Sequence, residues 1–380
     1  MRPFTFNPGP KLLAGPDQAQ ALADKLPGGP CLFVTDQEIV RLGLTDAYRE
    51  AIGADRDVIV FDAVEADPSK ETLLAATEAG RDCGAVSVVA LGGGSPMDVA
   101  KLAAYLLGSG DVLDEIWGVG IARGERLPLA LVPTTAGTGS EATPISVITC
   151  EGGVKLAVNS PPLIADWAVL DATLTLGLPA HVTAATGIDA IVHAVEAYTS
   201  ARLKNPLSDA LAREALRLLS GNLMTAIEQP SNIEARSAML LGAHLAGLAF
   251  SNAPVAGVHA LAYPLGGLHH LPHGLSNALM LRHVLAHNLE AARDHYAELA
   301  EIIEPDCAGQ GSQARAALLI ERLDELAKSS GLALRLRDHG IGQEEAPVLA
   351  REAMKQTRLL VNNPCEISES DARRLYEAAW

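Results

Sequence analysis

The pattern of apolar residues changes near residue 178, and this change constrains the fold more than any other feature. Before it, near-continuous apolar runs bounded by turn residues alternate with helical stretches. Such alternation predicts βαβ units, and therefore a largely parallel sheet covered by helices. The expected buried strands are 31–36, 57–62, 85–94 and 127–135, and the expected helices between them include 69–84 and 96–110.

Beyond Leu178 and Pro179 the strand pattern is absent, and Ala- and Leu-rich stretches with helical periodicity follow. The clearest of these predicted helices are 185–201, 207–227 and 233–250. We therefore expect an α/β domain with a Rossmann-like parallel sheet over 1–178 and an all-helical domain over 179–380. A chain of 380 residues is long enough for two separate cores.

Composition narrows the class of partner. The net charge of −17 repels phosphate, which argues against nucleic acid and anionic membranes as partners, and no apolar run is long enough to span a bilayer. The five cysteines lie far apart without a CxxC pair, as expected for free thiols in a reducing compartment. Because no apolar run follows Arg2 to form a secretory signal, we expect a cytoplasmic protein.

Two glycine-containing turns follow predicted strands and suggest a phosphate or nucleotide site. The turn GGGSPMD (92–98) opens a helix, whose free N–H groups and positive dipole end suit an anion. The turn PTTAGTGSEAT (133–143) supplies hydroxyl groups for a polar, flat ligand. At the end of the first strand, Asp36 is placed either to accept from a ribose hydroxyl or to cap the next helix; spacing leaves both open. A nucleotide spanning these strand ends is the expectation.

Histidines are concentrated in the helical half, where eight of the eleven lie between His244 and His295. Asp189 and His193 are four residues apart on a predicted helix and therefore share one face. His259 and His273 would lie about 21 Å apart on one continuous helix, at about 1.5 Å per residue.

The same segment holds prolines and glycines at 264, 266, 267 and 272, which predict that the helix breaks and the chain turns back. One carboxylate and three imidazoles are a plausible shell for Fe²⁺ or Zn²⁺. The pair His283 and His287 is a rival set of ligands that polarity alone does not exclude.

In this order and spacing, GGGSPMDVAK, VPTTAGTGSEAT, TGIDAIVHAVEAY and VHALAYPLGGLHHLPHG resemble the motifs of the iron-containing (group III) alcohol dehydrogenase family. The resemblance covers most of the chain, and four linked motifs make it specific. It implies a dehydroquinate synthase-like architecture, with an N-terminal dinucleotide-binding domain, an all-helical C-terminal domain and a catalytic cleft between them. It also implies NAD as the cofactor, with NADP as the alternative, and Fe²⁺ as the divalent metal, with Zn²⁺ as the alternative.

The residues carried over by motif fall into two sets. The metal ligands that the resemblance implies are Asp189, His193, His259 and His273. The cofactor contacts are Asp36 at the ribose, Gly93, Gly94 and Ser95 at the pyrophosphate, Asp98 at the helix start, Thr134, Thr135 and Thr138 in the second turn, and Lys155 near the ribose. His283 and His287 lie outside these motifs, so the resemblance implies that they are not ligands and belong to the surface or the core of a helix.

Three positions depart from the family pattern. Tyr263 replaces a histidine found in many members, Pro254 stands where relatives usually carry glycine, and Asp17 replaces the second glycine of a motif near the start. Tyr263 either shapes the pocket or relays a proton, and a tyrosine here resembles the branch of the family that uses hydroxy acids. His269, between two of the ligands, is the other candidate catalytic residue.

The resemblance implies an NAD(P)-linked alcohol dehydrogenase or aldehyde reductase. Hydride would pass between nicotinamide and a small primary alcohol or hydroxy acid, with the metal as Lewis acid for the substrate oxygen. Maleylacetate reductase and 4- or 5-hydroxy acid dehydrogenase are alternatives within the family. Enzymes of this fold that act on phosphorylated substrates are disfavoured, because no Arg/Lys cluster accompanies the histidines. A non-catalytic metal or nucleotide sensor is the alternative from another class. We expect a homodimer or larger homo-oligomer.

Overall fold

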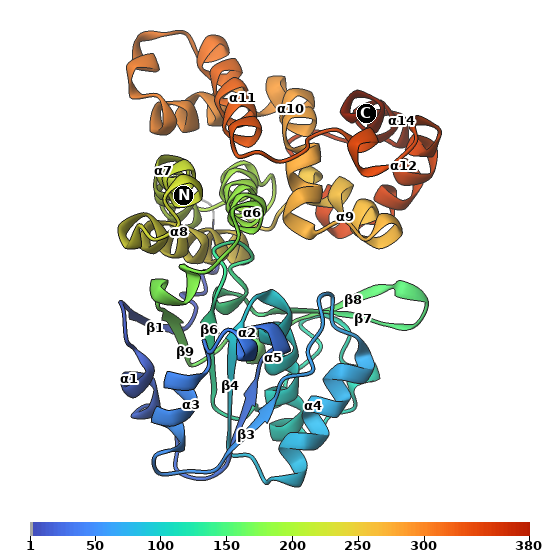
Figure 1. Ribbon diagram of the computed structural model, residues 1–380. Coiled ribbons are helices and arrows are strands. Elements are labelled where there is room, and N and C mark those ends of the chain that lie inside the picture. The colour runs from blue at the N-terminus through green and yellow to red at the C-terminus, as the bar shows by residue number, and fades with distance from the viewer. Residues whose placement is uncertain (1–2) are drawn as a thin grey trace. The chain divides into compact units, whose positions relative to one another are not determined.

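The computed structural model describes residues 3–380, which form two compact units (Figure 1). One unit is Pro8–Gly177, and the other is Leu178–Trp380 together with the short segment before Pro8. Strands occur in the first unit, whereas the second is built from helices within the described residues.

The unit Pro8–Gly177 is organised around a parallel sheet of six strands, among the residues described, in the order β1-β9-β6-β4-β2-β3. The expected parallel α/β architecture is therefore confirmed. The strands are β1 (Lys11–Ala14), β2 (Cys31–Val34), β3 (Val58–Phe61), β4 (Ser87–Gly92), β6 (Leu129–Pro133) and β9 (Trp167–Leu170).

Alternate residues of the central strands enter two different cores, because successive side chains of a strand point to opposite faces. Leu32 and Val88 belong to the core under helices α4 and α5, whereas Phe33 and Val89 belong to the core under α1, α2 and α3. All four side chains are fully buried, which explains why these strands read as continuous apolar runs. The helices are α1 (Ala19–Ala23), α2 (Gln37–Arg41), α3 (Asp46–Gly53), α4 (Lys70–Asp82) and α5 (Gly94–Ser109).

Several strands were not predicted from the sequence. β1 is largely exposed and lacks a continuous apolar run, whereas β9 was overlooked although its residues are apolar. A smaller sheet also lies in this unit, in the order β5-β8-β7, where β8 pairs in parallel with β5 and antiparallel with β7. Its strands are β5 (Gly118–Val119), β7 (Ile145–Thr149) and β8 (Lys155–Asn159).

In the helical unit, α6 packs against α7, α8 and α10, and α10 also packs against α9 and α11. The predicted helices 185–201, 207–227 and 233–250 correspond to α6, α7 and α8. The bounds are α6 (Ala180–Thr199), α7 (Pro206–Glu228), α8 (Ile233–Asn252), α9 (Gly257–His269), α10 (His273–Ile303), α11 (Ser312–Ser329), α12 (Ala346–Met354), α13 (Thr357–Leu360) and α14 (Glu369–Ala379).

No single helix in residues 3–380 combines the length and apolar character needed to cross a membrane. Helices α8 and α9, bent by 105° at the break between them, meet that test only when taken together, by length and composition.

The helix break predicted within 259–273 is confirmed and falls at His270. α9 continues through Pro264 and both following glycines to His269, so the prediction that they interrupt the helix was wrong. A proline removes one helical hydrogen bond and clashes with the carbonyl four residues earlier, but the buried packing of α9 outweighs this cost. The chain turns at His270, which adopts the left-handed conformation (φ 55°), and Pro272 then precedes α10.

Candidate metal centre and nucleotide cavity

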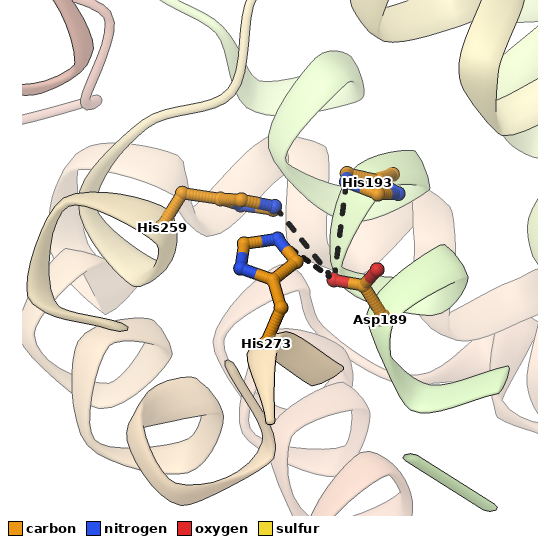
Figure 2. Close-up of side chains that lie close together, drawn as sticks. All are labelled: Asp189, His193, His259 and His273. Carbon is orange, nitrogen blue, oxygen red and sulfur yellow. Dashed lines mark ion pairs between the residues drawn. The ribbon is translucent and has the colours of Figure 1, made fainter. Parts of the chain in front are cut away.

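Three helices bring one carboxylate and three imidazoles together in the helical unit (Figure 2). Asp189 and His193 lie one turn apart on α6, His259 lies in the first turn of α9, and His273 is the first residue of α10. The turn after α9 reverses the chain, so that the rings of His259 and His273 lie 5.3 Å apart between centroids. The rings of His193 and His259 stack at 4.7 Å. The geometry thus unites all four predicted ligands.

The spacing of the four ligand atoms suits one divalent ion. The Oδ1 atom of Asp189 lies 3.9 Å from Nε2 of His193, 3.8 Å from Nε2 of His259 and 3.6 Å from Nε2 of His273. Tetrahedral coordination with bonds of about 2.1 Å separates ligand atoms by about 3.4 Å. The observed distances between ligand atoms are slightly longer, and a small inward movement of the side chains would bring them to this separation. His273 is the exposed member of the cluster, whereas the other three side chains are buried.

Asp189 carries the charge that such a site requires. Burial raises the pKa of its carboxyl, but the imidazoles of His193, His273 and His259 and the amide of Asn277 outweigh burial and hold the pKa below its ordinary value. Asp189 is therefore ionised at neutral pH and available as an anionic ligand.

Two side chains at this centre were missed in the sequence. The amide Nδ2 of Asn277 donates to Oδ1 of Asp189 at 2.6 Å and lies 3.2 Å from Nε2 of both His259 and His273. Glu196 lies 2.7 Å from the opposite ring nitrogen of His259, Nδ1. The available indication was helical spacing: Asn277 follows His273 by four residues, and Glu196 follows His193 by three.

Of the two candidate catalytic residues, the structure places one beside the cluster. The ring of Tyr263, one turn after His259 on α9, lies 6.0 Å from the ring of His273. His269 ends the same helix, and at about 1.5 Å per residue it is about 15 Å further along the axis than His259. Its Nε2 atom lies 3.1 Å from the carboxylate of Glu345. A catalytic role for His269 remains a prediction.

A cavity of about 520 Å³ lies in the other unit, at the carboxyl ends of neighbouring strands, lined by 36–38, 62–66 and 93–96. The chain passes from β2 to β3 on one side and returns to β4 on the other side of β2, so the strand order reverses between β2 and β4. Ligands of parallel α/β sheets bind outside the carboxyl ends of the strands at such a reversal.

The two glycine-containing turns meet beside this cavity. A Cβ placed on Gly94 would lie 3.0 Å from Cγ2 of Thr138, and one on Gly93 would lie 3.8 Å from Oγ1 of Thr135. Gly93, Gly94 and Ser95 line the cavity at the N-terminus of α5. Backbone N–H groups of a first helical turn lack partners within the helix and suit an anion.

Of the two sequence-based interpretations of Asp36, the helix cap is confirmed. Its Oδ1 atom accepts a hydrogen bond from the Ile39 N–H at 2.9 Å, so Asp36 caps α2. The same residue also lines the cavity. A contact between Asp36 and a ribose remains a prediction.

Asp98 and Lys155 contact other protein groups. The Asp98 carboxylate accepts from Ser140 Oγ at 2.7 Å and from the Val147 N–H at 2.9 Å. The fully buried Lys101 lies 3.7 Å from it; burial lowers the pKa of Lys101 to about 8, an effect that Asp98 opposes. Lys155 pairs at 2.6 Å with Asp67, which directly follows the cavity segment 62–66. Asp98 is thus bonded to the turn that holds Ser140, and a cofactor contact of Asp98 or Lys155 remains a prediction.

The rival histidines lie further along α10. Nε2 of His287 lies 3.1 Å from the Glu366 carbonyl oxygen, and burial lowers the pKa of His283. Neither belongs to the cluster of metal-ligating side chains found within the described residues.

Comparison with known families gives matches over both units. Residues 9–172 match the iron-containing alcohol dehydrogenase model, and residues 183–380 match the C-terminal model of the Fe-containing alcohol dehydrogenase family.

Individual relatives extend over nearly the whole chain. Long-chain-alcohol dehydrogenase 1 of Geobacillus thermodenitrificans (strain NG80-2) is 39% identical over 368 residues, covering 96% of this chain and 93% of its own. The crystal structure of a 1,3-propanediol oxidoreductase superposes with a TM-score of 0.96 at 33% identity, with both chains fully covered. Sulfoacetaldehyde reductase from Bifidobacterium kashiwanohense, solved in complex with NAD⁺, has a TM-score of 0.89 at 28% identity, covering 100% of this chain and 99% of its own.

Proposed function

The chain belongs to the iron-containing alcohol dehydrogenase family of oxidoreductases that act on CH–OH groups, and from this premise we propose that it interconverts a small primary alcohol or hydroxy acid and its carbonyl product with NAD. The observation that carries the proposal is the convergence of Asp189, His193, His259 and His273 from three helices on one point.

These four side chains are proposed to hold one divalent ion. The ionised carboxylate of Asp189 supplies the anionic ligand, and the three Nε2 atoms supply the neutral ones. A divalent ion held there supplies Lewis acidity toward the carbon–oxygen group of the substrate. The family supports Fe²⁺ as the resident metal, whereas the general order of affinities favours Zn²⁺ over Fe²⁺, so the purified protein is expected to take up either.

The cavity between the ends of β2 and β4 is proposed as the NAD site. Gly93 and Gly94 have no side chain to keep the pyrophosphate from the N-terminus of α5. Asp36 retains a second carboxylate oxygen, which would accept from a ribose hydroxyl and repel the 2′-phosphate of NADP. We propose that Thr135 and Thr138, beside the same glycines, contact the cofactor as well. The NAD⁺ complex of the Bifidobacterium relative supports this choice of cofactor.

In the oxidation direction the carbinol carbon gives a hydride to nicotinamide and the hydroxyl group gives up a proton, so one alcohol and one NAD⁺ yield one carbonyl compound, one NADH and one proton. Tyr263 is proposed to act at the wall of the substrate site, because it lies one turn beyond His259 and its ring is near His273. There its hydroxyl would orient a polar group of the substrate.

Assembly and cellular location are proposed on separate grounds. A homodimer or larger homo-oligomer is supported by the exposure of apolar side chains on and beside the small sheet, where Val119 is 67% exposed and Val154 is 55% exposed. A cytoplasmic location is supported by the absence of disulfides among the five cysteines, all of which lie in the described residues.

The test is NADH formation or consumption on a panel of alcohols, hydroxy acids and aldehydes, with Fe²⁺ or Zn²⁺ supplied to metal-stripped protein. His259→Ala should remove most bound metal and nearly all turnover while NADH still binds. The matched control is His283→Ala, which deletes an imidazole of α10 outside the cluster and should retain both metal and turnover. Full activity of rigorously metal-stripped wild-type protein would show that the assignment is wrong.

A further inference from the structure

Glu196 is a buried carboxylate at the metal centre that does not belong to the ligand set. It lies on α6, three residues after His193, and its exposure is 3%. A buried carboxylate is costly unless donors surround it. Here one oxygen, Oε2, is 2.7 Å from Nδ1 of His259 and accepts from the Ala256 N–H at 2.9 Å, while Oε1 accepts from the Val258 N–H at 2.6 Å.

These contacts join two of the helices that supply ligands. Ala256 is the N-cap of α9 and provides no side-chain cap of its own, so the N–H groups of its first turn need outside acceptors. Glu196 satisfies those of Ala256 and Val258, and Asn363 accepts from Gly257 at 3.2 Å. The start of α9, and with it the backbone of His259, is therefore fixed against α6.

The environment of the His259 ring selects one tautomer. An ionised carboxylate only accepts, so Nδ1 must carry the proton. At the other side of the ring, Nε2 lies 3.2 Å from the Asn277 amide nitrogen, which is a donor because it also donates to Asp189 at 2.6 Å. Together the two neighbours favour the tautomer with the proton on Nδ1 and the lone pair on Nε2.

We propose that Glu196 is a positioning residue of the metal centre, which holds His259 in the Nδ1–H tautomer so that Nε2 is presented to the ion. The proposal rests on the function proposed above, because it presumes that His259 is a ligand. Carboxylates behind metal-bound imidazoles orient the ring and raise its basicity, and their loss typically lowers metal affinity about 10- to 100-fold.

The decisive substitution is Glu196→Gln. In either orientation its NH₂ group meets at least one of the donors that the carboxylate now accepts from, so it cannot serve all three. The matched control is Glu298→Gln on α10, whose carboxylate accepts from Tyr198 on the same helix as Glu196 and touches no ligand. The measurement is Zn²⁺ affinity of the metal-free proteins by chelator competition, with thermal unfolding of the same metal-free samples.

We expect Glu196→Gln to weaken Zn²⁺ binding by about 10- to 100-fold, while Glu298→Gln keeps the wild-type affinity. Wild-type affinity in Glu196→Gln together with a lower unfolding temperature would overturn the proposal, because Glu196 would then only cap α9. His259→Ala separates this result from failure of the proposed function. If that variant also binds Zn²⁺ with wild-type affinity, His259 is not a ligand, and both the assigned metal site and the proposed role of Glu196 are refuted.

A second measurement uses wild-type protein and does not depend on any Glu196 variant folding. In ¹⁵N-histidine-labelled protein loaded with Zn²⁺, His259 should show a protonated Nδ1 and a metal-bound Nε2. The resonance is assigned by its disappearance in His259→Ala. Metal bound through Nδ1, or a proton on Nε2, would overturn the proposal.

Discussion

Gly274 offers a direct test of how the metal centre is held together. It follows His273 at the start of α10 and packs against α6. A Cβ at this position would lie 2.3 Å from the carbonyl oxygen of Ala185, 2.7 Å from its carbonyl carbon and 3.3 Å from Cβ of Asp189. Favourable carbon contacts begin at about 3.5 Å, so Gly274→Ala requires α10 to move from α6 by about 1 Å. No side-chain rotation relieves the clash, because the obstacle is backbone.

That displacement acts directly on the ligands. His273 would move with α10 away from Asp189, to which its Nε2 now lies at 3.6 Å, whereas metal sites tolerate deviations of only about 0.2 Å. Overpacking of this kind costs about 1–3 kcal/mol. If metal binding has to bring α10 back to its original distance from α6, the binding free energy is reduced by the same amount, about 1–3 kcal/mol. The affinity for the ion then falls about 5- to 150-fold.

The assay is Zn²⁺ affinity by chelator competition, accompanied by urea unfolding of the metal-free protein. Gly267→Ala is the matched control: it adds the same methyl group within α9, where nothing lies within 4 Å of the new Cβ. Because glycine in a helix interior is less stable than alanine by about 0.5–1 kcal/mol, this control should be slightly stabilised. Wild-type affinity in Gly274→Ala would refute the argument that the close contact between α6 and α10 sets the ligand spacing.

Three further predictions concern the rest of the molecule. Asp36→Gly should raise the kcat/KM for NADP relative to NAD about tenfold, an effect of about 1.4 kcal/mol; an unchanged ratio would leave Asp36 only as the cap of α2. Tyr263→Phe should reduce kcat/KM on substrates with a second polar group while sparing simple aldehydes; loss on every substrate with a shifted pH–rate profile would instead identify a proton relay. Lys101→Met leaves the carboxylate of Asp98 without its cation and should destabilise the protein by about 3–5 kcal/mol in urea unfolding, whereas Lys155→Met removes a partly exposed pair and should cost at most about 1 kcal/mol.

The parallel sheet was predictable because its central strands are buried on both faces, so the sequence around Phe33 and Val89 is nearly continuous in apolar residues. β1 could not be found in the same way, because it is largely exposed and carries no continuous apolar run; the apolar residues of β9 were overlooked. The break between α9 and α10 was expected, but Pro264 and the two glycines after it do not make it. Proline and glycine preferences are local, whereas the burial of Leu261 and Leu265 on either side of Pro264 is a tertiary effect.

The metal centre shows a second limit of the sequence, since helical spacing encodes both its ligands and their supporting groups. On α6, Asp189, His193 and Glu196 recur at intervals of four and three residues, and on α10 Asn277 follows His273 by four. On a single face, α6 and α10 therefore each carry at least one ligand and one residue that touches a ligand. The histidines were conspicuous because imidazole is rare in this chain and concentrated in one half. Glutamate and asparagine are common on exposed helix faces, and only burial distinguishes Glu196 and Asn277 from such residues. A supporting carboxylate or amide of a metal centre is thus recognisable from sequence only after its ligands are known, by examining the same helix face one turn away.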